Sequence, residues 1–290
     1  MQERVFIDNL HQALRRGQWI ALAPLSLGAA LAAISFALHQ EINFWLLLLL
    51  AFGGAATAAL LWLQSSLIDQ QFFPQIAQTR GLEMAPSGEG FLRLLPDEIR
   101  AIGTRQRVSN AVRADFGGQF WQAGFLECSH RDLRTGSSKT LFSGQIVQLQ
   151  CAADLPDFLL LPQGLRLRRA LPLSRSPLPH ALQIGAKGQT WALTLPEACA
   201  QDIWAEACAK LLEDLPSPPA PAQIIALFCR QGWLQIICAQ KSDLFSLWQG
   251  ILPARDAHGA AQNVFNALLW AERAAFGLAV FEKERANPAS

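Results

Sequence analysis

The sequence predicts an α+β protein: an N-terminal two-helix transmembrane hairpin, then a cytoplasmic domain with a mainly antiparallel sheet, a mid-chain helix and a long C-terminal helix. Three observations support this prediction. Only one formally charged residue, Glu41, lies between Arg16 and Asp69. Apolar and polar residues alternate in several segments after residue 104, as they do in strands. The segment 257–285 instead repeats its apolar residues with a helical period.

Two apolar segments, residues 19–38 and 42–63, lie on either side of the His39–Gln40–Glu41 break. As helices of about 20 residues, each would cover roughly 30 Å, the thickness of the hydrocarbon core of a bilayer. We therefore expect residues 19–64 to contact the lipid bilayer as a hairpin that follows a cytoplasmic tail over residues 1–18. A cleaved signal peptide is the alternative for the first span, but its apolar run exceeds the usual length.

The basic residues predict the orientation of the hairpin. Arg4, Arg15 and Arg16 precede the first span, whereas the connecting turn has no lysine or arginine. By the positive-inside rule, both the N-terminus and the domain that follows the hairpin lie in the cytoplasm. Neither span contains a charged residue that could serve an ion pathway. The hairpin is therefore interpreted as an anchor.

Small residues recur at a spacing of four within both spans. Gly28 and Ala32 lie in the first span, and Gly54 and Ala58 lie in the second. This spacing lets helix backbones approach closely, so we expect the two spans to pack on each other. Self-association through the same faces is the alternative, and it would produce a homo-oligomer.

The chain after the hairpin is predicted to begin with a juxtamembrane helix over residues 65–83, which Pro74 kinks or breaks. The cytoplasmic α+β domain then covers residues 84–290. Its predicted strands include a meander, two short strands and a later hairpin: 105–116, 119–130, 141–151, 158–161, 165–167, 224–229 and 233–238. Within the first strand, alternation places a set of apolar residues on one face: Val108, Val112, Ala114 and Phe116.

Two helices complete the predicted domain. Thr194 and Glu197 form a capping-box pair for a helix of about 18 residues. Its predicted buried stripe is Cys199, Ile203, Ala207, Cys208 and Leu211. The C-terminal helix carries polar and charged residues that favour docking on the sheet over a third span. Its predicted apolar side is Val264, Phe265, Leu268, Leu269, Phe276 and Val280.

Composition and motifs exclude several classes of function. A net charge of +1 argues against a nucleic-acid binder. The 6 cysteines lack a CxxC pair or zinc spacing, which predicts buried, reduced thiols and no metal site. The chain has no Walker A loop, Rossmann fingerprint, GxSxG elbow or HExxH pair. We therefore expect no cofactor and no recognisable catalytic activity.

Two candidate sites remain. Cys128 and His130 would share one face of a strand, where a thiol and an imidazole could form a catalytic pair. The alternative is a core cysteine beside an edge histidine. Arg166, Arg168 and Arg169 form a basic cluster that could bind anionic lipid or a partner surface. A solvated strand face is the alternative for this cluster.

The layout resembles an uncharacterised bacterial family of membrane proteins, called domain of unknown function 3137. The resemblance covers the two spans, the final helix and residues 99–162, with the short motifs Val112–Gly117, Leu141–Ile146 and Leu155–Phe158. The chain departs from the family pattern in having no tyrosine. The resemblance implies a location in the bacterial inner membrane and implies no particular activity.

The leading functional hypothesis is a membrane-anchored cytoplasmic interaction or regulatory domain that binds an unidentified protein partner at the membrane. One alternative is a membrane-associated enzyme that uses Cys128 and His130. The other is a sensor of anionic lipid that uses the arginine cluster.

Overall fold

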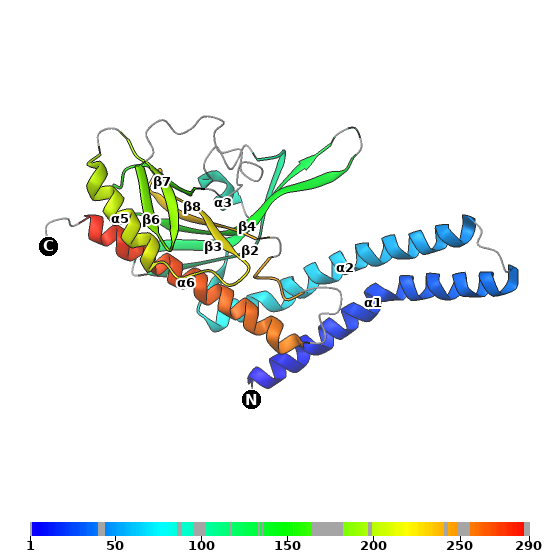
Figure 1. The fold of residues 1–290 in the computed structure, drawn as a ribbon. Helices are drawn as coiled ribbons and strands as arrows, with labels where there is room; N and C mark the ends of the chain where they lie inside the picture. Colours follow the sequence, from blue (N-terminus) through cyan, green and yellow to red (C-terminus); the bar gives the residue numbers. More distant parts are fainter. Residues whose placement is uncertain are drawn as a thin grey trace. The chain divides into compact units, whose positions relative to one another are not determined.

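The computed structural model describes residues 2–39, 44–85, 89–95, 102–116, 118–132, 134, 136–152, 154–163, 182–196, 199–240, 243–248 and 256–286. The chain forms two compact units. The hairpin unit contains Met1–Ile76 and Ser246–Phe265, and the sheet unit contains Ala77–Phe245 and Asn266–Ser290. Two long N-terminal helices, an antiparallel sheet, a mid-chain helix and a long C-terminal helix confirm the predicted α+β class (Figure 1).

The hairpin unit is built from α1 (Gln2–His39) and α2 (Phe44–Thr79). The predicted cytoplasmic tail, residues 1–18, is part of α1 from Gln2 onward. The predicted juxtamembrane helix, residues 65–83, is not a separate helix, because α2 continues through this segment to Thr79. Leu10 and Leu14 are fully buried, so the packing of α1 extends beyond its apolar span. Pro74 lies inside α2, whose helix continues past it. Glu41 and the turn between the helices lie outside the described residues.

The two helices approach each other closely at Gly28 and Gly53. A Cβ atom added to Gly28 would lie 3.2 Å from the Leu49 carbonyl oxygen, and one added to Gly53 would lie 2.9 Å from the Pro24 carbonyl oxygen. A Cβ on Gly54 would have no atom within 4 Å. The spans therefore pack on each other as expected, but Gly53 takes the place predicted for Gly54.

Gly53 and Gly54 are adjacent in α2 but differ in what an added methyl group would contact. Gly53→Ala should lower the stability of the hairpin by about 1–3 kcal/mol, because the new methyl group meets backbone that cannot move aside. Gly54→Ala gains the same helix propensity and meets open space, so it should not destabilise the hairpin. Thermal unfolding of the detergent-purified chain measures both variants. Equal melting temperatures would contradict the assigned contact.

Among the described residues, the sheet unit contains one nine-stranded sheet in the order β1-β2-β3-β4-β9-β8-β5-β7-β6, with antiparallel pairing throughout. The strands are β1 (Glu83–Met84), β2 (Arg105–Phe116), β3 (Gln119–Arg131), β4 (Ser138–Gln150), β5 (Phe158–Pro162), β6 (Leu182–Ala186), β7 (Gln189–Thr194), β8 (Gln223–Arg230) and β9 (Trp233–Ala239). The predicted meander and the later hairpin are confirmed. The short strand predicted over 165–167 lies outside the described residues.

A β-bulge changes the predicted alternation of β2. The register shifts between Ser109 and Val112, and Asn110 has a φ of 48°. Val108 consequently pairs with Leu126, whereas Val112 pairs with Ala123. Those partners lie on opposite faces of β3, because alternate residues of a strand point to opposite sides. The prediction that Val108 and Val112 share a face is therefore wrong.

Three glutamines directly opposite one another form a buried row across β3, β4 and β9, which we call the glutamine ladder. Gln122 donates from Nε2 to Oε1 of Gln148 over 2.6 Å, and Gln148 donates to Oε1 of Gln235 over 2.8 Å. Gln235 then donates to the Leu94 carbonyl oxygen over 2.7 Å. Leu94 is the last residue of α3 (Glu89–Leu94), so the ladder joins three strands to that helix.

Helix α5 (Gln201–Asp214) differs from its prediction at its start and on its buried side. Thr194 lies in β7, and Ala200 precedes the helix without a side-chain cap, so the predicted capping box is wrong. Pairing of Thr194 with Leu159 in the sheet removes it from the helix start. Glu197 lies outside the described residues. The predicted Ile203 is 59% exposed, and the buried residues are Ala207, Cys208, Leu211 and Leu212.

Helix α6 (Ala257–Ala286) has almost the predicted bounds, but part of its predicted apolar side faces outward. Phe276 is 61% exposed and Val280 is 41% exposed. Within the sheet unit, the buried stripe is instead Leu268, Ala271, Ala275, Leu278 and Phe281. Phe281 packs against Phe158 and Trp204, which lie in β5 and α5. Arg80 also pairs with Glu272 of α6, and Gln119 donates to Glu282.

Candidate functional sites

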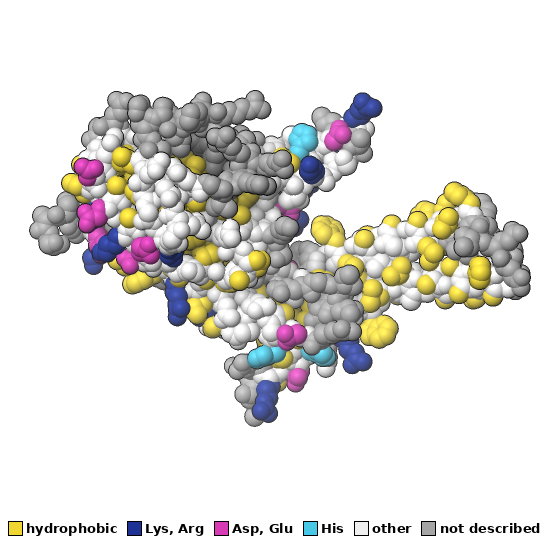
Figure 2. All heavy atoms as spheres, viewed as in Figure 1, with side chains coloured by type: hydrophobic (Ala, Val, Ile, Leu, Met, Phe, Trp, Pro, Cys, Tyr) yellow, Lys and Arg dark blue, Asp and Glu magenta, His cyan; other side chains and the backbone are white. Residues whose placement is uncertain are grey.

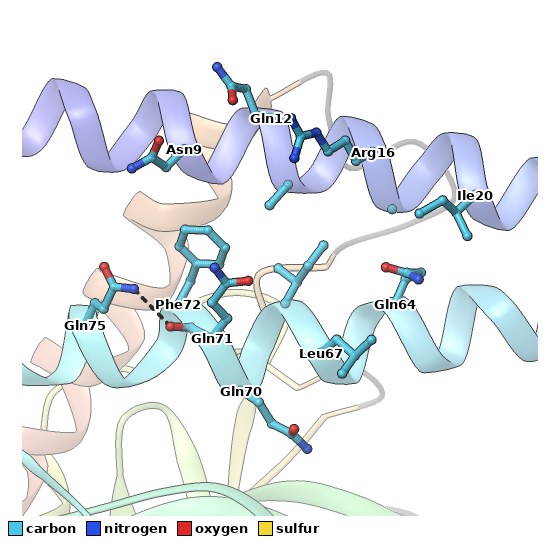
Figure 3. A pocket seen from close by; sticks show the side chains of 13 residues that line it. Asn9, Gln12, Arg16, Ile20, Gln64, Leu67, Gln70, Gln71, Phe72 and Gln75 are labelled. Carbon is cyan, nitrogen blue, oxygen red and sulfur yellow. Dashed lines mark hydrogen bonds between the residues drawn. The ribbon is translucent and has the colours of Figure 1, made fainter.

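A polar groove of 740 Å³ runs between α1 and α2 in the hairpin unit, and we call it the amide groove (Figure 3). The amide side chains come from both helices: Asn9, Gln12, Gln64, Gln70, Gln71 and Gln75. Their spacings of three, four and seven residues place most of them on one flank of each helix. Of the described residues that line the groove, Arg16 is the single charged one.

The base of the groove depends on a close approach at Gly17. A Cβ atom at this position would lie 3.2 Å from Oε1 of Gln64 and 3.0 Å from the Trp248 ring. The segment that carries Trp248 is fixed to α2 by Asp69, which accepts hydrogen bonds from Ser246 Oγ and from the backbone N–H of Leu247, each at 2.7 Å. The glycine therefore lets the helices and this segment pack together beside the groove.

Several polar groups of the amide groove are available to a ligand. Gln75 donates to the Gln71 carbonyl oxygen over 3.0 Å, and Gln70 donates to Ser66 over 3.3 Å. Within the described part of the chain, the remaining polar side chains have no hydrogen bond or ion pair: Asn9, Gln12, Arg16, Gln64 and the Gln71 amide. These groups can both donate and accept hydrogen bonds, and Arg16 adds a positive charge.

A second groove, of 340 Å³, lies between α5 and α6 in the sheet unit, and we call it the α5–α6 groove. Its walls are mainly apolar and include Leu211, Phe276, Val280 and Phe281. Charged residues of both signs lie at its edge: Lys210, Asp214, Arg273 and Glu284. Lys210 forms an ion pair of 3.0 Å with Glu284 across the groove. Exposed apolar patches with a polar rim mark contact sites for a protein, a membrane or a ligand.

Cys128 and His130 have different environments on β3. Cys128 is fully buried in an apolar cluster that includes Leu126 and Phe142, whereas His130 is exposed. Burial, together with the negative charge of Glu127, raises the pKa of the Cys128 thiol to about 12. A nucleophilic cysteine needs a lowered pKa, so this environment does not favour the catalytic pair. Within the described ranges, no three His, Cys, Asp or Glu side chains converge as metal ligands.

The cysteine environments predict an order of reactivity. Burial raises the pKa of Cys208 to about 12 as well, while Cys151 and Cys199 are half-buried. At neutral pH, a thiol-reactive probe should label Cys151 and Cys199 in the native chain and leave Cys128 and Cys208 unmodified. Mass spectrometry of the labelled peptides measures this order. If Cys128 reacted as fast as Cys199, the hypothesis of a Cys128–His130 enzyme would regain support.

The same pKa shifts predict a change of stability at alkaline pH. The folded state favours the neutral thiol of Cys128, because its pKa is raised from 9.0 to about 12. Its contribution to folding is therefore complete below pH 9.0 and declines as the pH rises towards 12. Replacing Cys128 with alanine should reduce this alkaline loss of stability in thermal unfolding experiments.

Three helices among the described residues are long and apolar enough to cross a membrane: α1, α2 and α6. Only 17% of the most apolar window of α1 and 11% of that of α2 are buried, compared with 50% for α6. Hydrophobic side chains accordingly cover much of the outer surface of the hairpin (Figure 2). These observations indicate membrane association, and the packing of α6 accords with its predicted docking.

The predicted lipid-binding residues Arg166, Arg168 and Arg169 lie outside the described residues. Sequence reasoning also missed the amide groove. The signal that could have found it is the repeated spacing of amides at Gln64, Gln71 and Gln75, opposite the polar residues of α1. Each of these glutamines is unremarkable alone, and only the antiparallel packing of the helices brings the two rows together.

The fold and these surfaces define an α+β protein with an apolar helical hairpin. No protein-family model matches the sequence, and no curated protein matches it. The chain is similar to the solved structure of the mycobacterial trehalose monomycolate transport factor A, TtfA, at 11% sequence identity and a TM-score of 0.39. The similarity covers 72% of this chain and 93% of the other. It is too distant to assign a function.

Proposed function

We propose that this chain is a membrane-anchored interaction protein whose sheet unit binds a partner protein at the cytoplasmic membrane surface. The observation that carries the proposal is the α5–α6 groove, where the apolar side chains of Phe276 and Val280 are exposed on the helix that packs on the sheet. The exposed apolar surfaces of α1 and α2 support the anchoring role. A tether of this kind raises the effective concentration of the groove for partners at the same membrane.

Several features support the cytoplasmic orientation in this proposal. Arg4, Arg15 and Arg16 lie at the base of the hairpin, where the positive-inside rule places cytoplasmic charges. The 6 cysteines are all free thiols, as expected in a reducing compartment. The apolar helices then hold the sheet unit close to the inner surface of the membrane, where it meets membrane-bound or peripheral partners.

The α5–α6 groove best fits an amphipathic helix from the partner. Such a helix places apolar side chains into an apolar groove at positions i, i+3, i+4 and i+7. Leu211, Phe276, Val280 and Phe281 provide the apolar walls. Charged residues of both signs on the partner helix would pair with Arg273 and Asp214 at the edge of the groove. These pairs would set the direction and register of the partner helix. The anchors on the partner are therefore expected to be leucine, methionine or an aromatic residue.

Site-specific photo-cross-linking in intact cells tests this proposal. A photoreactive amino acid at Phe276 or Val280 should cross-link to one and the same protein, identified by mass spectrometry. The matched control is Ile203, which is 59% exposed on α5 but lies outside the groove. A synthetic helix from the identified partner should then compete with cross-linking at Phe276. Equal cross-linking at Ile203, or lipid products alone at all positions, would refute the proposed groove.

A further inference from the structure

The amide groove lies next to the part of the hairpin expected at the membrane–water interface. Trp19 is 68% exposed and Trp62 is 64% exposed, and exposed tryptophans of apolar helices are typical of this interface. Arg16 and Gln64 are within one helical turn of these tryptophans along α1 and α2. The groove therefore extends from the level of the lipid headgroups towards the cytoplasm, provided that the hairpin is anchored as proposed above.

The polar groups of the groove match a particular headgroup chemistry. The guanidinium of Arg16 has no ion-pair partner among the described residues and can bind a phosphate through two hydrogen bonds. Among the described residues, no carboxylate lines the groove to repel an anion. The amides of Gln12, Gln64 and Gln71 can donate to and accept from hydroxyl groups. A cationic choline group would find no complementary charge here.

Apolar side chains also line the membrane end of the groove. Ile20 is 50% exposed and Leu67 is 48% exposed, and Figure 3 shows both of them near Gln64 at this end. From there the exposed apolar surface continues along the hairpin through residues such as Leu27 and Leu31. A molecule with a polar head in the groove could thus lay its acyl chains along the helices without leaving the hydrocarbon region.

We propose that the amide groove binds the headgroup of an anionic phospholipid that carries free hydroxyls, with its phosphate on Arg16 and its hydroxyls on the amides. This inference rests on the membrane anchoring in the proposed function and goes beyond the partner groove of the sheet unit. Because the groove is formed by both helices and abuts the segment of Trp248, a bound lipid would also stabilise the base of the hairpin.

Native mass spectrometry of the full chain, released from detergent micelles, tests this inference. Phosphatidylglycerol and phosphatidylcholine with identical acyl chains are added in equal amounts. The wild-type chain should retain phosphatidylglycerol preferentially. Arg16→Gln should weaken this retention about tenfold, as expected for the loss of a charge-assisted interaction. Gln64→Leu and Gln71→Leu should weaken it without altering the net charge.

The control variant is Arg15→Gln, which removes the same charge from the neighbouring residue that does not line the groove. Retention should stay at the wild-type level in this variant. If Arg15→Gln and Arg16→Gln reduced the retention of phosphatidylglycerol equally, the effect would be one of diffuse charge, and the proposed site would be overturned. Equal retention of the two lipids by the wild-type chain would overturn it as well.

Two further measurements distinguish failure of the lipid site from failure of the proposed anchoring, and lipid binding from the binding of a free anion. Flotation of membranes reports anchoring, and Arg16→Gln should float as well as the wild-type chain. If the wild-type chain failed to float, the anchoring itself would be refuted. Millimolar glycerol phosphate should not displace the lipid, because it lacks the acyl chains that contact Ile20 and Leu67. Displacement would show a site for soluble phosphate esters and refute the lipid assignment.

Discussion

Replacing Phe52 with arginine should greatly reduce the amount of this protein in the membrane fraction. Phe52 lies within the second apolar segment and is 69% exposed. If lipid covers this surface, the arginine opposes insertion by about 3 kcal/mol relative to phenylalanine at the centre of a span. That difference corresponds to a shift of roughly a hundredfold in the partition between membrane and water. Carbonate extraction followed by immunoblotting of the two fractions measures it.

The control is Phe276→Arg, which introduces the same residue at a position that is 61% exposed on the third candidate span, α6. We expect this variant to remain in the membrane fraction, because α6 packs on the sheet. If Phe52→Arg and Phe276→Arg were both lost from the membrane fraction, α6 would be a third span, and the predicted orientation of the chain would change. Retention of Phe52→Arg would show that the apolar surface of α2 is covered by protein.

Replacing Gln148 with leucine should strongly destabilise the centre of the sheet. The substitution leaves the Nε2 group of Gln122 and the Oε1 atom of Gln235 without their ladder partners in a buried environment. Each unpaired group costs about 1–3 kcal/mol, so the opening free energy of these strands should fall by roughly 3 kcal/mol. Hydrogen exchange of the amides in β3, β4 and β9 should then accelerate about a hundredfold.

The control for the glutamine ladder replaces Gln122, Gln148 and Gln235 together with leucine. This triple variant removes the donors and acceptors as a set and leaves only the Leu94 carbonyl without its ladder partner. We expect it to be more stable than Gln148→Leu alone, because paired removal avoids buried unpaired groups. If the triple variant lost about three times as much stability, packing volume would explain the effect and hydrogen bonding would not.

Local patterns predicted the longer elements of this protein, but they did not predict strands β1, β6 and β7 or the short helix α3. The β8–β9 hairpin follows from two apolar runs around Gln231 and Gly232, which have φ values of 51° and 75°. The two long N-terminal helices follow from apolar runs that contain almost no charge. Both signals depend on neighbours in the sequence, which is why they could be read without the fold. The same holds for the bounds of α6.

Predictions that required knowledge of a facing surface were less successful. Alternation along β4 places Gln148 on the face opposite Val147 and Leu149, and only the structure shows that its side chain is fully buried against two other glutamines. The helical pattern of α6 indicated that Phe276 is on the packed side, but the side chain is exposed. In both cases the residue type is compatible with either environment, and the partner that decides between them lies far away in the sequence.

The sequence by itself determined that this protein has an apolar helical hairpin joined to an antiparallel sheet with two further helices. Composition and periodicity suffice for this, because charge-free helices and alternating strands each need only local residues. Only the tertiary structure decided that Gly53 forms the close contact and that amides of two helices meet in one groove. It also placed Phe276 in the wall of a second groove. Each of these features depends on the rotation of one element against another, and that rotation is set by the summed packing of distant side chains.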